Sequence, residues 1–407
     1  MTSSGPRKFA SINDADVNDK AVLVRVDFNV PFDQEGRITD DRRISSAVPT
    51  IRSILDRGGK AVLMSHLGRP EGTGYEAKQS LQPVATHLGT LLGRDVLFPS
   101  RDCVDEAATA AVDAMNPGDV LLLENLRFNP GEKAGSDHFA AHLAAYGDLY
   151  CNEAFGSAHR ADASMVGVPS CMKPRPCVAG PLLEKEIRWL RDAISTPEHP
   201  FVAILGGAKI SDKLGTIRNL AGKVDTLIVG GAMAFTLLKA MGHATGKSLV
   251  ESSMIEEAGR IIADVEKTST TLLLPTDFVC GEDPSGETHT EVFGRDIPED
   301  FMGLDIGMKT TEAFTAAIRN ARTIVWNGPM GLFEVPPFDV GTMQVGEAIR
   351  DATAKGASSI AGGGDTAAAV QAFGLNEGFS HVSTGGGASL KLLEGQKLPG
   401  LGVLDQT

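Results

Sequence analysis

The stretch Ser358–Phe373, SSIAGGGDTAAAVQAF, decides the fold predicted for this chain. A short apolar run, Ile360–Ala361, ends in three glycines, and Asp365 and Thr366 then open an alanine-rich segment of good helix formers. The pattern predicts a strand, a turn without Cβ atoms and a capped helix start. Backbone N–H groups at a helix N-terminus bind phosphate, and Asp365 suits a hard cation such as Mg²⁺. A tight strand–helix turn with Asp365 as its N-cap is the plainer alternative.

Short apolar runs alternate with helical patterns along the whole chain, which predicts parallel α/β architecture. The 407 residues are enough for two domains with separate cores. A net charge of −14 argues against a general nucleic-acid surface. The N-terminus lacks the apolar core of a signal peptide, and no run of about 18 apolar residues indicates a membrane span. We therefore expect a cytoplasmic protein with neither nucleic acid nor membrane as a partner.

The cysteines and histidines do not form a metal-binding pattern. The five cysteines include no CxxC pair, which indicates reduced thiols. Cys171 and Cys177 flank a proline-rich stretch, and a disulfide between them is the alternative. The nine histidines show no ligand spacing, so we expect a metal ion to enter with a ligand or through carboxylates.

The first predicted strand, Ala21–Val30, carries an unusual polar row. Val22, Val24, Val26 and Phe28 share one face, while the other bears Arg25, Asp27 and Asn29. We expect Arg25 to be a salt-bridged strand end. Asp27 and Asn29 lie nearer the carboxyl end, where ligand contacts are expected.

In the first half of the chain, arginine or histidine follows several predicted elements. A helix is expected from 40–43 to Leu55, and further strands over 60–65, 120–123 and 149–151. In open α/β sheets, ligands bind at the carboxyl ends of the strands. Guanidinium groups bind phosphate and carboxylate in a bidentate manner. The predicted cleft for a small, multiply anionic substrate contains Arg43, His66, Arg69, Arg127 and Arg160.

A helix over Leu182–Ile194, between two proline-bounded segments, is expected to connect the two halves. The later strands, over 201–205, 226–229, 323–326, 360–361 and 381–383, end in glycines. Several such turns on one sheet edge would form a surface of exposed N–H groups fit for a nucleotide. Lys209 and Lys213 are expected to share one face of a helix's opening turn and to hold a polyphosphate. Solvated lysines are the alternative.

Eight stretches, in order, resemble the signature segments of the phosphoglycerate kinase family. They are RVDFNVP, MSHLGRP, LLENLRF, NEAFGSAHR, GGAKISDK, WNGPMGLFE, GGGDT and STGGGAS. The resemblance implies two Rossmann-like, mainly parallel domains joined by a helix and hinge, with the C-terminal tail returning to the N-terminal domain. The implied boundaries are 1–180 with tail 390–407, a connecting helix over 181–196, and a nucleotide domain over 197–389. A monomer is also implied.

The implied reaction is reversible phosphoryl transfer between 1,3-bisphosphoglycerate and MgADP, giving 3-phosphoglycerate and MgATP. Hinge closure would bring the substrates together. The implied triose site comprises Asp27, Phe28, Asn29, Arg43, His66, Leu67, Gly68, Arg69, Arg127 and Arg160. The implied nucleotide site comprises Gly207, Lys209, Lys213, Gly231, Gly303, Asn327, Glu334, Gly363, Gly364, Asp365 and Thr366. The implied catalytic residues are Arg43, Lys209, Lys213, Gly363 and Gly386.

Finer roles also follow from the resemblance. Asp365 would hold Mg²⁺, Glu334 would lie at the ribose, and Gly303 would lie beside the adenine. Glu153, Ser157 and Met308 stand where the family more often has Asp, Thr and Pro. None of these departures removes a charged contact, so the implied activity stands, and the shape of the adenine pocket stays open.

Three other functions remain as alternatives. A kinase for another small carboxylate would share the nucleotide half, and a non-catalytic two-domain anion-binding protein would share the basic cleft. A nicotinamide dehydrogenase is disfavoured, because no strand–GxGxxG–helix unit has an acidic residue about 20 residues further on. Gly242–Ser248, GHATGKS, is not a P-loop, since its first glycine is one residue too close and a helical pattern precedes it.

Overall fold

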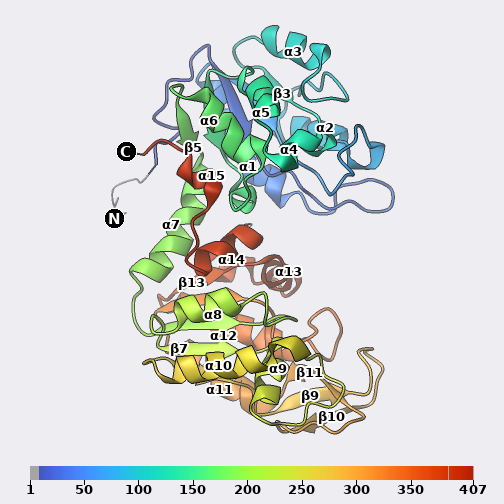
Figure 1. Ribbon diagram of the computed structural model, residues 1–407, viewed down its shortest axis with the longest axis vertical. Helices are drawn as coiled ribbons and strands as arrows, with labels where there is room; N and C mark the ends of the chain where they lie inside the picture. Colours follow the sequence, from blue (N-terminus) through green and yellow to red (C-terminus); the bar gives the residue numbers. More distant parts are fainter. Residues whose placement is uncertain (1–8, 384, 407) are drawn as a thin grey trace. The chain divides into compact units, whose positions relative to one another are not determined.

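The computed structural model describes residues 9–383 and 385–406 and confirms the two-part, mainly parallel α/β fold (Figure 1). One compact unit runs through Ile187 and takes in the residues from Lys397 onward, and the other is Arg188–Gln396. Helix α7 (Pro181–Ser195) contains the division between them and extends the expected helix by one residue at each end. No helix within the described residues is both long and apolar enough to cross a membrane.

The first unit is built on a five-stranded parallel sheet with the strand order β3-β2-β1-β4-β5. Its strands are buried on both faces, as their nearly continuous apolar runs predict. All carboxyl ends share one edge, where the Arg- and His-bearing loops begin. The strands are β1 (Ala21–Arg25), β2 (Lys60–Met64), β3 (Val120–Leu122), β4 (Leu149–Asn152) and β5 (Cys177–Ala179).

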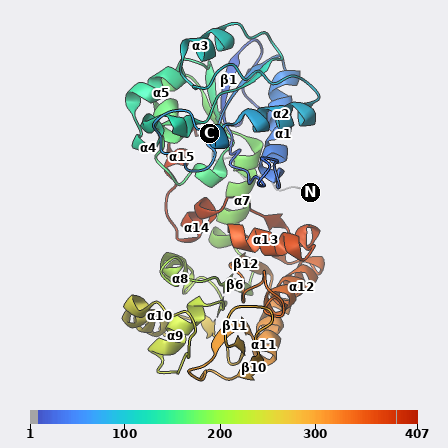
Figure 2. The same cartoon turned by 90° about the vertical axis from the view of Figure 1, so that its right-hand side faces the viewer.

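Helices cover both faces of this sheet, with α1 and α2 on one side and α4 and α5 on the other (Figure 2). The buried face of α1 presents Ile44, Ile51 and Ile54 to the sheet at helical spacing. The helices are α1 (Arg42–Asp56), α2 (Gln82–Leu92), α3 (Glu106–Asp113), α4 (Pro130–Ala134), α5 (Asp137–Ala144) and α6 (Val168–Met172). Single turns lie at η1 (Ala77–Gln79), η2 (Leu126–Phe128), η3 (Phe155–Ser157) and η4 (Ala163–Gly167).

The C-terminal tail, coloured red in Figure 1, packs on this first unit through α15 (Pro399–Gly402). Gly400 N donates to Ala158 O at 3.0 Å, and the Asn152 side chain donates to Gly400 O at 3.2 Å. Asp405 accepts from Cys177 N at 2.8 Å. The return of the tail, implied by the family resemblance, is therefore present in the fold.

The second unit has a six-stranded parallel sheet with the strand order β14-β13-β12-β6-β7-β8. Its core surrounds Trp326, whose side chain is fully buried and whose indole N–H donates to Gly328 O at 2.8 Å. The strands are β6 (Phe201–Leu205), β7 (Thr226–Val229), β8 (Thr271–Leu273), β12 (Thr323–Asn327), β13 (Ser358–Ala361) and β14 (His381–Val382).

Helices again cover both faces, with α8 and α10 on one side and α11 and α12 on the other (Figure 2). They are α8 (Leu214–Leu220), α9 (Met233–Ala240), α10 (Ile255–Glu266), α11 (Met308–Arg319), α12 (Val340–Ala354), α13 (Gly364–Ala372) and α14 (Gly387–Leu393). Single turns lie at η5 (Ser252–Met254) and η6 (Asn376–Gly378).

A small antiparallel sheet, ordered β10-β9-β11, was not expected from the sequence. It consists of β9 (Phe278–Gly281), β10 (Thr290–Phe293) and β11 (Met302–Ile306). Its core is small and centres on Phe235 and Phe278, whose ring centroids lie 4.7 Å apart.

Candidate active site

The loop after β1 places Asp27 beside Arg43, another predicted triose contact, at the start of α1. Arg43, in the first turn of α1, donates from Nη1 to Asp27 Oδ1 at 3.0 Å. Both side chains keep some exposure, 33% for Arg43 and 13% for Asp27, so an entering ligand can reach them. Asp41, the N-cap residue of α1, makes no side-chain capping bond, whereas the Asp40 carboxylate accepts from Arg42 N at 3.1 Å.

His66 lies between two guanidinium groups. Arg25 Nη2 lies 3.2 Å from its Nδ1, and Arg160 Nη2 lies 3.3 Å from its Nε2. Burial holds the pKa of His66 well below its ordinary value, and the cations Arg25 and Arg160 lower it further. Both effects favour the neutral imidazole of His66 over the imidazolium.

A second hydrogen-bonded group links the ends of β1, β2 and β3. Asn29 Oδ1 accepts from Gly68 N at 2.8 Å, and Arg127 Nη1 donates to Gly68 O at 2.6 Å. Among the described residues, the buried Nε of Arg127 has no hydrogen-bond partner. Gly68 has a φ of +60°, in the left-handed region that favours glycine.

The remaining predicted triose contacts differ in what they can offer. The side chains of Phe28 and Leu67 are buried in the core, so any ligand contact from them is limited to backbone atoms. Phe28 N already donates a hydrogen bond to Ser65 Oγ at 2.9 Å. Arg69 is exposed in the loop after β2.

The basic side chains of this cleft act on one another electrostatically. Arg43 lowers the pKa of both His66 and Arg160, although burial is the larger cause in each case. Such crowding of cations favours occupancy by an anion, because a phosphate or carboxylate between them removes the repulsion. The arrangement supports the predicted anionic substrate, while the individual binding roles stay predictions.

In the second unit, the glycine turns after β6, β7 and β12 pack backbone against backbone. A Cβ on Gly231 would lie 2.5 Å from Gly207 N, and one on Gly328 would lie 2.1 Å from Gly206 O. The amides of Gly207 and Gly231 donate to Pro329 O at 3.0 Å and Met330 O at 3.1 Å. The amides of Gly207 and Gly231 therefore cannot contribute to the predicted surface of exposed N–H groups, because carbonyls of a neighbouring turn already accept from them.

The GGGDT turn keeps free donors at the start of α13. Helix α13 begins at Gly364, and its N-cap is Gly363 with a φ of +97°. The alternative in which Asp365 is the N-cap is therefore wrong, since Asp365 lies inside the first turn and makes no capping bond. Within the described residues, no acceptor is recorded for the amides of Gly364, Asp365 and Thr366, as expected for a helix start that is open to an anion.

Lys213 lies beside this helix start. Its Nζ donates to Asn327 Oδ1, while Asn327 Nδ2 donates to Gly362 O at 2.8 Å. Burial lowers the pKa of Lys213, and the neighbouring carboxylates Asp212 and Asp365 counteract part of that effect. Helix α8 begins only at Leu214, so Lys209 and Lys213 do not share a helical face, contrary to the sequence-based expectation.

A cavity of about 580 Å³ nevertheless brings these lysines together. Lys209, Lys213, Gly207 and Asp365 line it among the predicted nucleotide contacts. Asn327 and Thr366 lie behind the cavity wall and hydrogen-bond to residues that form it. Asn327 Oδ1 accepts from Lys213, and Thr366 Oγ1 accepts from Gly328 N at 2.7 Å. The remaining wall, which sequence reasoning missed, includes Ser211, Asp212, Leu390, Lys391 and Glu394.

Gly231, Gly363 and Gly364, described above, are not part of this cavity wall, and neither are Gly303, Glu334 and Gly386. Gly303 is on β11, where a Cβ would lie 2.2 Å from Phe235 Cζ, so a side chain there would displace the Phe235 ring. Glu334 is exposed in the loop after β12. Gly386 is the N-cap of α14, with a φ of +49°. Thr384 of the STGGGAS stretch lies outside the described residues.

The residues present fit a Mg²⁺ ion that is bound together with a nucleotide. The carboxylate of Asp365 is exposed beside the open amides of α13, and the described residues record no hydrogen bond or ion pair for it. Mg²⁺ is commonly held by one or two carboxylates plus substrate phosphates. The described residues contain no group of three or more His, Cys, Asp or Glu that would hold a metal without a ligand.

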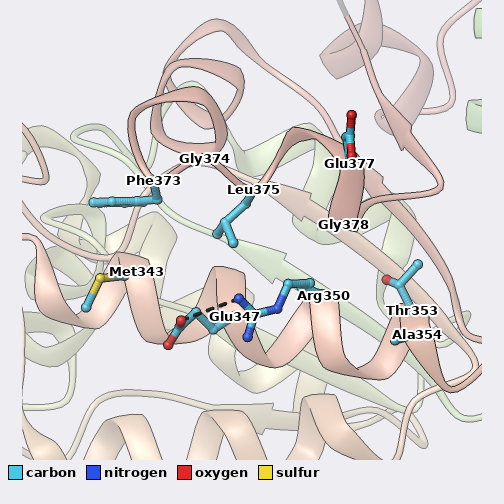
Figure 3. A pocket seen from close by; sticks show the side chains of 10 residues that line it. All are labelled: Met343, Glu347, Arg350, Thr353, Ala354, Phe373, Gly374, Leu375, Glu377 and Gly378. Atoms are coloured by element: carbon cyan, nitrogen blue, oxygen red, sulfur yellow. Dashed lines mark ion pairs between the residues drawn. The ribbon is translucent and has the colours of Figure 1, made fainter.

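A second cavity, of about 520 Å³, lies between α12 and the loop after α13 (Figure 3). Its wall includes Met343, Phe373 and Leu375, and Glu347 pairs with Arg350 across 3.5 Å. It contains none of the predicted site residues.

Comparison with known proteins identifies the family. The model of the family described as phosphoglycerate kinase matches residues 12–396. The chain is 53% identical to the phosphoglycerate kinase of Rhodopirellula baltica over 97% of this chain and 99% of the relative, and 49% identical to that of Chlorobium phaeobacteroides over the same shares. The solved phosphoglycerate kinase of Coxiella burnetii is 37% identical, with a TM-score of 0.86 over 97% of this chain and 98% of that one. The Pyrococcus horikoshii enzyme is 30% identical, with a TM-score of 0.84 over the same shares. Because the family model and these relatives match nearly the whole length of the chain, this chain belongs to the phosphoglycerate kinase family.

Proposed function

We propose that this protein transfers a phosphoryl group reversibly between 1,3-bisphosphoglycerate and MgADP, giving 3-phosphoglycerate and MgATP. The family membership supports this activity, and one structural observation carries it. A cluster of arginines with a neutral histidine lies at one sheet edge, and a cavity with two lysines and an open helix start lies at another. Each edge suits one anionic substrate, and neither alone provides for a transfer.

The chemistry requires alignment and charge neutralisation more than proton transfer. In the ATP-forming direction, a β-phosphate oxygen of ADP attacks the acyl phosphate in line, and the carboxylate of 3-phosphoglycerate leaves. Because the attacking and leaving groups are both anions, no general base is needed. The transferred group spreads negative charge over its equatorial oxygens, and preorganised cationic donors stabilise that charge.

Residues of this chain are assigned roles on that basis. Arg43 leaves Asp27 to bind the reacting end of the triose, while His66, Arg127 and Arg160 hold its other anionic groups. Lys213, which is partly buried, follows the moving phosphoryl group, and the free amides of Gly364 to Thr366 hold nucleotide phosphate. Asp365 would hold Mg²⁺, which would supply neutralisation of phosphate charge when bound with the nucleotide.

The cellular and conformational details belong to the same proposal. We infer that hinge closure of the two units excludes water from the transfer, as lid and domain closures do in other enzymes. We also infer a monomeric, cytoplasmic enzyme. Small-angle scattering with both substrates bound tests the closure, and an unchanged radius of gyration would contradict it.

The test of the activity is a coupled assay with ATP and a panel of carboxylates. Turnover with 3-phosphoglycerate, and none with glycerate, acetate or aspartate, is expected. Preference for another carboxylate would replace this proposal with a different kinase activity, which the family match over residues 12–396 does not favour. Binding of both ligands without turnover would indicate a non-catalytic protein.

A further inference from the structure

Below the triose cleft, a buried chain of hydrogen bonds ends at His66. The Glu132 carboxylate accepts from Ser164 Oγ at 2.6 Å and from Ser164 N at 2.9 Å. Ser164 Oγ in turn accepts from Arg25 Nε at 2.8 Å. Glu132, Ser164 and Arg25 have no exposed surface. This is different from the salt-bridged strand end expected for Arg25, because its direct partners are a hydroxyl, a carbonyl and an imidazole.

The guanidinium of Arg25 cannot move to suit His66. Nε is held by Ser164, and Nη1 donates to Val26 O. The remaining nitrogen, Nη2, lies 3.2 Å from His66 Nδ1 and contacts the imidazole. Arginine has donors only and stays charged in proteins, so His66 Nδ1 has to be the acceptor in this contact. The single proton of the neutral ring is then on Nε2.

That proton faces another donor. Arg160 Nη2 lies 3.3 Å from His66 Nε2 and donates to Ser157 Oγ at 2.9 Å. Two donors directed at each other gain no hydrogen bond, and an anionic oxygen between them would accept from both. The opposite tautomer would satisfy Arg160 but would direct two donors at each other at the buried Arg25. The Arg160 side chain is 28% exposed and can shift, whereas the buried Arg25 cannot. The two opposed donors are therefore His66 Nε2 and Arg160 Nη2, on the side of the ring that faces solvent.

We propose that Arg25 is a positioning residue that fixes His66 as its Nε2–H tautomer, so that His66 and Arg160 together donate to one oxygen of the anionic substrate. Arg25 does not touch the substrate and acts only through the imidazole. This assignment rests on the proposed function for the identity of the anion, but the tautomer itself is a property of the ligand-free chain. A histidine that donates, rather than one that accepts, makes the site selective for an anion over a neutral or cationic group.

The direct test is nitrogen NMR on ligand-free protein labelled with ¹⁵N-histidine, with the His66 signals assigned by their loss in His66→Gln. The expected spectrum has an unprotonated Nδ1 and a protonated Nε2 near neutral pH. A proton on Nδ1, or an imidazolium with both nitrogens protonated, would overturn the proposal. This result does not depend on any enzyme assay, so it is distinguishable from failure of the proposed function.

Variants then connect the tautomer with binding. In Arg25→Met, we expect a mixture of His66 tautomers and on the order of 10-fold weaker 3-phosphoglycerate binding, with nucleotide binding unchanged. Arg25→Lys, which keeps a donor, should recover part of the affinity. If Arg25→Met does not fold, Ser164→Ala loosens the same guanidinium and should shift the tautomer populations in the same direction. Unchanged tautomers in a folded Arg25→Met, or in Ser164→Ala where that variant has to serve, would refute the assignment.

Discussion

Glu153 gives a prediction whose magnitude can be worked from the structure. Its carboxylate, at the end of β4, is 1% exposed and accepts from Leu182 N and Leu183 N at the start of α7, each at 3.1–3.2 Å. The Thr50 hydroxyl of α1 also donates to it. Burial raises the pKa of Glu153 from 4.5 to about 7, although these hydrogen bonds act in the opposite direction. The residue therefore joins α1, whose first turn carries the proposed triose contact Arg43, to the connecting helix α7.

The sign of the effect follows from proton binding. Between about pH 4.5 and 7, the folded protein keeps a proton on Glu153 that the unfolded chain has released, so stability falls as the pH rises through this window. Each pH unit corresponds to about 1.4 kcal/mol, which gives a loss of about 3 kcal/mol by pH 7. Glu153→Gln keeps the shape and removes the titration. We expect its stability relative to wild type to improve by about that amount between the two ends of the window.

The assay is native-state hydrogen exchange of the β4 amides, because both tryptophans, Trp189 and Trp326, lie in the other unit. Glu299→Gln, at an exposed site, is the matched control and should follow the wild-type profile. Parallel pH profiles for wild type and Glu153→Gln would refute the reasoning, since they would show that the carboxyl group titrates alike in the folded and unfolded chains.

Two further predictions concern the nucleotide half. Asp365→Asn should raise the Mg²⁺ concentration needed for half-maximal turnover while leaving 3-phosphoglycerate binding unchanged, and an unaltered Mg²⁺ titration would remove Asp365 from the metal site. Gly231→Ala should destabilise more than Gly242→Ala: both positions have positive φ, at +66° and +93°, but only at Gly231 would the new methyl meet backbone, 2.5 Å from Gly207 N. The φ strain alone is about 1–2 kcal/mol, so equal urea midpoints for the two variants would show that the glycine turns relax apart.

Local patterns were sufficient for most of the parallel fold. The apolar runs at Phe201–Leu205 and Thr226–Val229 have the same bounds in the structure. A parallel strand that is buried on both faces is a nearly continuous apolar run, so its position can be predicted from its own residues. The antiparallel sheet of β9, β10 and β11 could not be read in this way. Its strand β10 is largely exposed, and β11 has an irregular register between Gly303 and Asp305.

The site shows the same division between local and tertiary information. The unpaired backbone amides at the start of α13 can be predicted from the sequence GGGDT, since the first amides of a helix have no partner within the helix. The amides of Gly207 and Gly231 are satisfied by carbonyls of a third turn, which no local pattern records. The strand pattern likewise predicts only a structural role for Arg25, because its contact with His66, 41 positions away, arises from the tertiary fold.

The most direct test of the central claim measures ATP-dependent acyl-phosphate formation from 3-phosphoglycerate by wild type, Arg43→Ala and Lys213→Ala. One variant removes a cation from the triose cleft, and the other removes one from the nucleotide cavity. For charged groups that act in the transition state, kcat should fall on the order of 100-fold or more in each. The predicted result is turnover by wild type and a lowered kcat in both variants. A normal kcat in both variants would contradict the proposal that the triose cleft and the nucleotide cavity both take part in the transfer.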